Sequence, residues 1–139
     1  MMEAHGCPRP MTAPDDGDVP AWLLPGPFPP EFGTAERCFI VEELNDPACP
    51  EASLARARVA PGVTTRNHLL RGTVECYVIR EGTGRVEIGG ETRDVGPGDR
   101  VVIPADTPQR ITNTGEGDLV FHCLCVPRFL PANYVDLGD

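Results

Sequence analysis

Short segments in which hydrophobic and polar residues alternate run along most of the chain, separated by turn residues. Residues 37–44, 53–59 and 63–71 each read as a strand on this pattern. Gly89 and Gly90 lie between two further alternating segments and predict a hairpin, because type I′ turns require positive φ. Residues 118–126 are mostly apolar, which is typical of a strand buried on both faces. The pattern therefore predicts an all-β protein.

The two ends of the chain depart from this alternation. Residues 1–18 contain few apolar side chains, so we expect a disordered tail that cannot offset the entropy of ordering. Residues 19–36 carry aromatic and aliphatic side chains among prolines, which predicts an extended apolar arm. Such an arm covers either its own strands, in residues 37–127, or those of a second subunit. Residues 128–139 are expected to form an irregular tail or a short helical turn.

Length and composition narrow the class of protein. A chain of 139 residues suits one domain, and its 16 prolines and 15 glycines suit many short strands joined by turns. The net charge of −9 argues against binding to nucleic acid or to anionic lipid, which depends on clustered Lys and Arg. Small molecules remain the expected partners. No apolar run of about 18 residues is present and the first residues lack the features of a secretory signal, so a soluble cytoplasmic protein is expected.

The six cysteines form no CxxC pair and show no zinc-finger spacing. In a reducing compartment they are expected to be thiols. Cys123 and Cys125 stand two positions apart on a predicted strand and therefore share one face. We favour a role as small buried apolar residues over a role as soft metal ligands.

Glycines and polar residues at fixed spacing frame the central strands. The first group is Gly62, His68, Glu75 and Gly82, and the second is Gly98, Pro104 and Asn113. This spacing resembles the two sequence motifs of the cupin superfamily, G-x5-H-x-H-x4-E-x6-G and G-x5-P-x-G-x2-H-x3-N. These motifs belong to small β-barrels that often hold one metal, and the resemblance covers residues from about 53 to 127. It implies a single double-stranded β-helix, the jelly-roll barrel of the cupins, which the extended N-terminal arm precedes. If the arm covers a second subunit, the protein is a homodimer, as many cupins are.

The chain departs from the cupin motifs at three positions. Leu70 stands where the family has its second histidine, and Gln109 stands where it has the third. Asp106 replaces a glycine, which needs no special explanation in a turn. The metal ligands that the resemblance implies are therefore reduced to His68, Glu75 and Gln109. This set suits Fe(II), Mn(II), Ni(II) or Zn(II), bound more weakly than in a complete cupin site, and a barrel that has lost its metal is the alternative.

Four side chains are candidates for roles other than metal binding, and one of them, Glu75, is also a candidate ligand. Glu75 and Tyr77 share a strand face with the candidate ligands and are expected to move protons. Arg56 and Arg58 alternate with small residues and point either into the barrel mouth, where they would bind a substrate carboxylate or phosphate, or to solvent. His122 is interpreted as a hydrogen-bonded core histidine.

The sequence thus predicts a cupin that acts on a small molecule. Two functions remain open. The first is a metal-dependent enzyme, an isomerase, dioxygenase, lyase or cyclase, acting on a small oxygenated substrate. The second is a barrel without metal that binds a sugar or a carboxylate and catalyses nothing.

Overall fold

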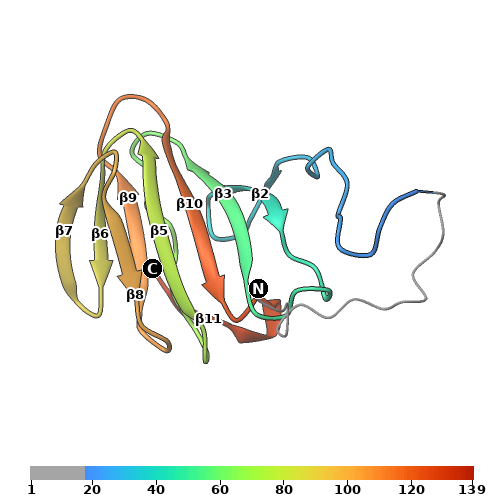
Figure 1. The fold of residues 1–139 in the computed structure, drawn as a ribbon. Coiled ribbons are helices and arrows are strands. Elements are labelled where there is room, and N and C mark those ends of the chain that lie inside the picture. The colour runs from blue at the N-terminus through green and yellow to red at the C-terminus, as the bar shows by residue number, and fades with distance from the viewer. Residues whose placement is uncertain (1–17) are drawn as a thin grey trace.

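The computed structural model describes residues 18–139, which form two antiparallel β-sheets that face each other as a barrel (Figure 1). The strands are β1 (Phe32–Gly33), β2 (Phe39–Leu44), β3 (Ser53–Val59), β4 (Asn67–Leu70), β5 (Val74–Glu81), β6 (Gly84–Ile88), β7 (Glu91–Val95), β8 (Arg100–Ile103), β9 (Gln109–Asn113), β10 (Leu119–Val126) and β11 (Tyr134–Gly138). A 3-10 turn, η1 (Pro131–Asn133), precedes β11. The larger sheet has the order β1-β2-β3-β10-β5-β8, and the smaller has the order β11-β4-β9-β6-β7. This confirms the predicted all-β fold.

Strand β10 lies inside the larger sheet, because it pairs with both β3 and β5. Its Phe121 lies opposite Ala57 on one side and Ile79 on the other, and all three belong to the buried core between the sheets. The outward residues of its second half, Leu124 and Val126, are exposed. The strand is therefore buried on both faces only near its start, and not along its length as the sequence predicted.

The glycine hairpin forms as predicted. Gly89 and Gly90 join β6 to β7 with φ angles of 57° and 88°, a region that residues with a Cβ rarely adopt. The two strands pair from Gly84 opposite Val95 to Ile88 opposite Glu91, so the tight turn sets the register of the hairpin.

The C-terminal segment differs from the expected irregular tail. After the short turn η1, residues 134–138 form β11 and pair with β4, where Asp136 lies opposite His68. Arg66 anchors this strand, because its Nε donates to Asp136 Oδ2 at 3.1 Å. The barrel thus extends beyond residue 127, since β11 forms the edge of the smaller sheet beside β4, which carries His68.

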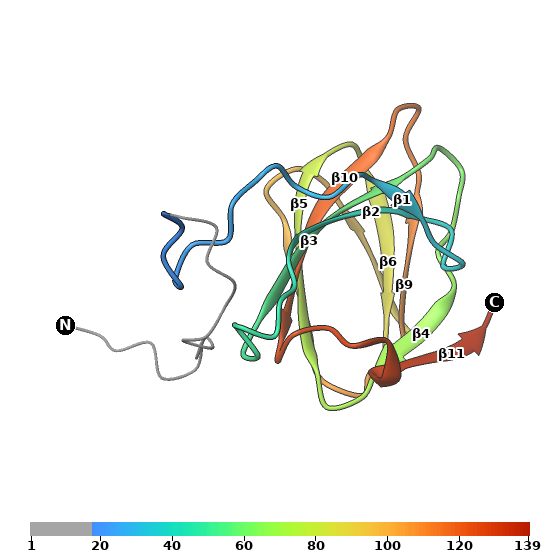
Figure 2. The same cartoon turned by 90° about the vertical axis from the view of Figure 1, so that its right-hand side faces the viewer.

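The N-terminal arm projects away from the barrel in both views (Figures 1 and 2). Residues 18–31 contain no strand or helix, and the short β1 that follows joins the larger sheet through β2. The apolar side chains of the arm are exposed in the single chain, above all Trp22 at 79% and Phe28 at 61%. The predicted disordered tail, residues 1–18, lies outside the described residues except for Asp18. The described part contains no helix long and apolar enough to cross a membrane.

Candidate active site

A cavity of about 320 Å³ lies between the two sheets. Its wall is largely aromatic and aliphatic, and it contains three carboxyl groups and one imidazole, those of Glu36, Glu42, Glu75 and His68. The volume is at the small end of the range for ligand pockets, so the cavity fits a small molecule. The sequence placed two of these four side chains, His68 and Glu75, in the site.

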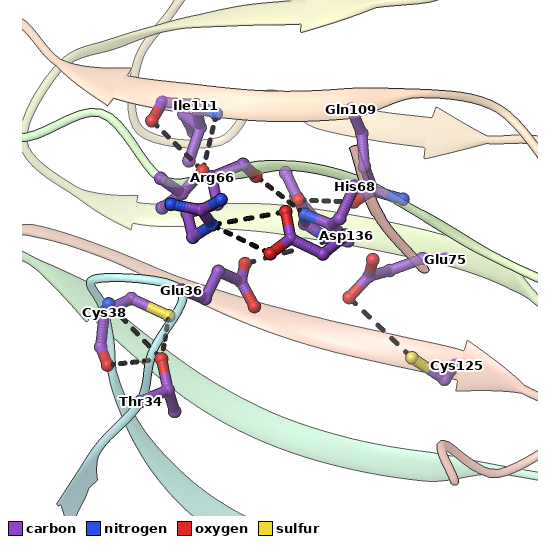
Figure 3. A network of polar contacts seen from close by, with 12 residues as sticks. Thr34, Glu36, Cys38, Arg66, His68, Glu75, Gln109, Ile111, Cys125 and Asp136 are labelled. Carbon is purple, nitrogen blue, oxygen red and sulfur yellow. Dashed lines mark hydrogen bonds and ion pairs between the residues drawn. The ribbon is translucent and has the colours of Figure 1, made fainter. Parts of the chain in front are cut away.

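Glu75 is directed into the cavity from the start of β5. Strand alternation places Glu75, Tyr77 and Ile79 on the buried face, and Glu75 is 8% exposed. Its Oε2 accepts a hydrogen bond from the Cys125 thiol at 3.7 Å, whereas its Oε1 is buried and has no partner among the described residues (Figure 3). Burial, reinforced by the nearby Glu36 carboxyl, raises the pKa of Glu75 to about 8. This carboxyl is therefore protonated at neutral pH.

His68 presents one defined ring nitrogen to the cavity. Its Nδ1 lies 2.9 Å from the backbone oxygen of Arg66, and because a carbonyl oxygen only accepts, Nδ1 carries the hydrogen. In the neutral ring, the other nitrogen, Nε2, then carries the lone pair, and this atom lies 3.8 Å from Glu36 Oε2. The ring stacks on Tyr134 of β11, with centroids 4.8 Å apart and planes 15° from parallel. Position, tautomer and orientation of the imidazole are thus fixed by neighbouring strands.

Glu36 enters the site from a turn that the sequence analysis had assigned to the end of the arm. The turn is closed by a hydrogen bond from the Arg37 N–H to the Thr34 carbonyl, and Arg37 has a φ of 77°. The backbone oxygen of Glu36 accepts from the Arg66 N–H at 3.1 Å, which fixes it beside β4. Burial raises the pKa of Glu36, and the adjacent His68 acts in the opposite direction. Figure 3 shows its carboxyl in the same group of side chains as His68 and Glu75.

The proposed third ligand, Gln109, is engaged elsewhere. Gln109 lies opposite His68 in the β4–β9 register and is 2% exposed, but its Oε1 accepts a hydrogen bond from the Tyr77 hydroxyl at 2.6 Å. Leu70 lines the cavity with a hydrocarbon side chain. Among residues 18–139, no three His, Cys, Asp or Glu side chains are grouped to hold a metal ion. The donor set of His68 and Glu75, with the Gln109 oxygen occupied, therefore fits a divalent cation poorly.

The two arginines of β3 lie outside the cavity. Ala55 and Ala57 line it, so the alternating Arg56 and Arg58 point to the other face of the sheet. There, Arg58 pairs with Glu31 at 2.8 Å and lies over the Phe39 ring at 4.3 Å. Of the two orientations that the sequence left open, the outer one is observed, and neither arginine can reach a ligand inside the barrel. The small alanine side chains leave room for the cavity instead.

His122 also lies on the outer face and not in the core. Its Nδ1 accepts from Arg80 Nε at 3.1 Å, and its Nε2 lies 3.2 Å from Glu43 Oε1. The three cysteines that face the cavity, Cys38, Cys123 and Cys125, are free thiols. Burial raises the pKa of each of these thiols, so they remain protonated.

Glu36 is one of the site residues that the sequence analysis missed, with Glu42 and Tyr134. It precedes the first motif by many residues and stands in a segment whose prolines and aromatic residues predict an arm. No spacing rule connects it to His68, because the contact is made by the chain folding back over the barrel edge. Its place within the turn that ends at the positive-φ residue Arg37 is visible only in the structure.

Comparison with known proteins identifies the family. Residues 55–127 match the family model of the cupin domain, which is more than half of the chain. The fold and the cavity between the two sheets agree with this match, and the chain belongs to the cupin family. An uncharacterized protein of Methanocaldococcus jannaschii is 36% identical over 93 residues, which cover 65% of this chain and 74% of that protein.

Several solved structures share the fold. The nucleoside dehydratase Pac13 of Streptomyces has a TM-score of 0.66 and 15% identity, covering 78% of this chain and 84% of that chain. KdgF of Halomonas has a TM-score of 0.65 and 20% identity, covering 72% and 87%. A predicted oxalate decarboxylase of Thermotoga maritima has a TM-score of 0.65 and 24% identity, covering 71% and 91%. At these identities the likeness concerns the fold alone.

Proposed function

We propose that this cupin catalyses proton transfer on a small hydroxylated carbonyl compound, as a lyase or an isomerase that needs no tightly bound metal. The observation that carries the proposal is the Glu75 carboxyl, which faces the cavity with Oε1 free of any partner among the described residues and with a pKa of about 8. A carboxyl group that keeps its proton at neutral pH can act as a general acid.

His68 supplies the complementary base. Because Nδ1 donates to the Arg66 carbonyl, Nε2 holds a lone pair that can accept a proton from a substrate carbon. Glu36 Oε2, 3.8 Å away, is placed to stabilise the positive charge that the ring then acquires. An acid and a base of different chemical type thus face one cavity, a common arrangement for proton transfer at carbon.

The reaction balances without any further reactant. His68 removes a proton from the carbon next to a carbonyl group, and the electron pair of that bond forms a carbon–carbon double bond. In a lyase, the bond to a neighbouring hydroxyl breaks, Glu75 gives its proton to that oxygen, and water leaves. In an isomerase, Glu75 protonates the carbonyl oxygen instead and an enediol forms, which returns to a carbonyl compound by the reverse transfers.

The side chains at the family's metal-ligand positions support a reaction without metal over a metal-dependent reaction. A leucine occupies one family ligand position, and the oxygen at another is bonded to the Tyr77 hydroxyl. One protein of this fold is named a nucleoside dehydratase and is described with uridine, so the fold accommodates elimination of water from a hydroxylated molecule. A cavity that binds its ligand without turnover shares the same walls and is the competing function.

Solvent deuterium exchange tests the proposal. Wild-type protein treated with a chelator is mixed in D₂O with a panel of uncharged hydroxyaldehydes and hydroxyketones, and NMR follows deuterium entering carbon and the loss of hydroxyl groups. We expect exchange in the wild type and a loss of about 100-fold or more in His68→Asn and in Glu75→Gln. Glu87→Gln is the matched control, because Glu87 pairs with Arg110 away from the cavity.

Two results contradict the proposal. Exchange that disappears with the chelator and returns with Fe, Mn, Ni or Zn would establish the metal-dependent enzyme. Panel members that bind to the cavity, detected by shifts of the Tyr77 and Tyr134 resonances, without any exchange would establish the binding protein.

The arm supports a second proposal, a homodimer in which it covers the barrel of a second subunit. Trp22, Phe28 and Phe32 are each at least 48% exposed in the single chain, an arrangement typical of side chains that pack against a partner. Sedimentation analysis of the wild type and of Trp22→Ser tests the dimer: we expect a dimer that the substitution weakens, and a monomeric wild type would refute it.

The cysteines seen as free thiols favour a reducing compartment such as the cytoplasm.

A further inference from the structure

The charges around the cavity define which molecules can enter it. We infer that the ligand of the His68–Glu75 site is uncharged and that the cavity excludes carboxylates and phosphates. The inference rests on the proposed function in taking this cavity as the functional site, and it adds the electrical character of the molecule bound there.

The first observation is the composition of the wall. Three carboxyl groups face the cavity, those of Glu36, Glu42 and Glu75, and no Lys or Arg stands among its described lining residues. Proteins bind carboxylates and phosphates through arginine, lysine or the N-terminus of a helix. The one helical element near the cavity is the three-residue turn η1, which is too short to offer such a terminus.

The second observation is where the arginines are. Arg58 is held on the outer face by Glu31 and Asp118, at 2.8 and 3.5 Å. Arg66, the arginine nearest to His68 in the chain, pairs with Asp136 at 3.1 Å. Both of these arginines are therefore paired with carboxylates outside the cavity.

The third observation is the apolar character of the wall around these carboxyl groups. An anionic group placed against such a wall would lose its hydration, and no Lys or Arg of the lining would offset this cost. An uncharged molecule meets no such penalty. A protonated carboxyl group both donates and accepts a hydrogen bond, which is what hydroxyl and carbonyl groups require.

A thiol placed in the cavity measures this charge without a known ligand. Ile40 lines the cavity and is only partly buried, so Ile40→Cys introduces a reachable thiol. Its rate of modification is compared at neutral pH, where the proposed function operates, for two reagents of similar size, the uncharged 2-hydroxyethyl and the anionic 2-sulfonatoethyl methanethiosulfonate. Peptide mass spectrometry resolves each thiol, and Cys76, on the outward face of β5, provides the reference in the same molecule.

For each thiol, we divide the modification rate with the uncharged reagent by the rate with the anionic reagent. We expect this ratio to be at least tenfold higher at the introduced thiol than at Cys76. Adding Glu42→Gln, which removes a carboxyl from the cavity wall, should lower the excess at least threefold, whereas Glu87→Gln, on the outer surface, should leave it unchanged. Equal ratios at the two thiols, or faster reaction with the anionic reagent, would overturn the inference. Should Ile40→Cys fail to fold, Pro131→Cys places the thiol at the exposed rim of the same cavity, with the same criteria.

This result is independent of turnover. The thiol reaction reports the charge of the cavity even if no exchange is found in D₂O, so failure of the proposed chemistry and failure of the charge inference are distinguishable. Likewise, an enzyme that loses exchange in His68→Asn but shows equal rate ratios would retain the proposed function and lose the inference on its ligand.

Discussion

Two buried polar side chains, Asn113 and Glu75, come from the two cupin motifs and have opposite environments. Asn113 ends β9 and is 1% exposed, and its amide is fully bonded: Nδ2 donates to the carbonyls of Val59 and Gly117 at 2.8 Å each, and Oδ1 accepts from the Gly115 N–H at 2.9 Å. Glu75 has one oxygen bonded to a thiol and one with no partner among the described residues.

This difference separates a structural from a functional motif position. A buried polar group with all its hydrogen bonds made stabilises the loops that it joins. A buried carboxyl with an unpaired oxygen costs stability, and such a group calls for an explanation in function. Motif spacing alone gives both residues equal weight, whereas hydrogen bonding shows that Asn113 joins the backbone of Val59, Gly115 and Gly117 and that Glu75 has an oxygen with no partner among the described residues.

The largest effect expected of one substitution at a fixed pH is on the structural side of this comparison. Asn113→Ala leaves the Val59 and Gly117 carbonyls and the Gly115 N–H without their partner, and we expect it to lower the free energy of unfolding by about 3 kcal/mol. Urea denaturation measures the change. A loss below about 0.5 kcal/mol would show that water replaces these bonds and that Asn113 is not a structural residue.

The next effect concerns the pH dependence of stability. The carboxyl of Glu75 loses its proton near pH 4.5 in the unfolded chain and near pH 8 in the folded one, so the unfolded state binds fewer protons in this window. The unfolding free energy therefore falls as pH rises from 4.5 to 8, by up to about 1.4 kcal/mol per pH unit, and levels off outside it. We expect Glu75→Gln to have a shallower slope than the wild type in urea titrations across the window.

The matched control is Glu87→Gln, whose slope should equal that of the wild type. Parallel slopes for the wild type and Glu75→Gln would mean that Glu75 titrates normally, and the contrast with Asn113 would then vanish.

The third prediction is that two substitutions beside His68 and Glu75 create a metal site in the cavity. Leu70→His with Gln109→His adds two imidazoles beside His68 and Glu75, and we expect the affinity for Zn(II) or Ni(II) to rise about 100-fold or more. Calorimetry of the wild type, both single variants and the double variant measures it. An unchanged affinity would show that these side chains do not converge on one point.

The smallest expected effect comes from changing the hydrogen-bond donor to Glu75. Cys125→Ser replaces a weak thiol donor by a hydroxyl, which binds an ionised carboxylate more strongly. The pKa of Glu75 should fall. The alkaline limb of the pH profile of the deuterium exchange rate should move to lower pH in parallel. A profile that stays in place would indicate that another group controls this limb.

Much of the fold could be predicted from the sequence because its determinants are local. Gly89 and Gly90 specify a turn, alternation specifies strands, and motif spacing specifies the family. Alternation does not say which face is inside, however, and the orientation of Arg56 and Arg58 became clear only once Ala57 was seen in the core.

The site could be predicted only in part, because its remaining determinants are contacts between distant segments. Glu36 reaches His68 from outside the motif region, and Tyr134 stacks on the same ring from a segment that the sequence assigned to a tail. The bond from the Tyr77 hydroxyl to Gln109, which occupies a proposed metal donor, is likewise a contact between two sheets.

The central claim is that Glu75 is a neutral acid in the folded protein, and its titration tests this most directly. Protein labelled with ¹³C at the glutamate carboxyl carbons is followed by NMR from acid to alkaline pH, with Glu75→Gln identifying the resonance. The carboxyl of Glu75 should titrate near pH 8. Titration near 4.5, the ordinary value for this side chain, would contradict the assignment of Glu75 as the general acid.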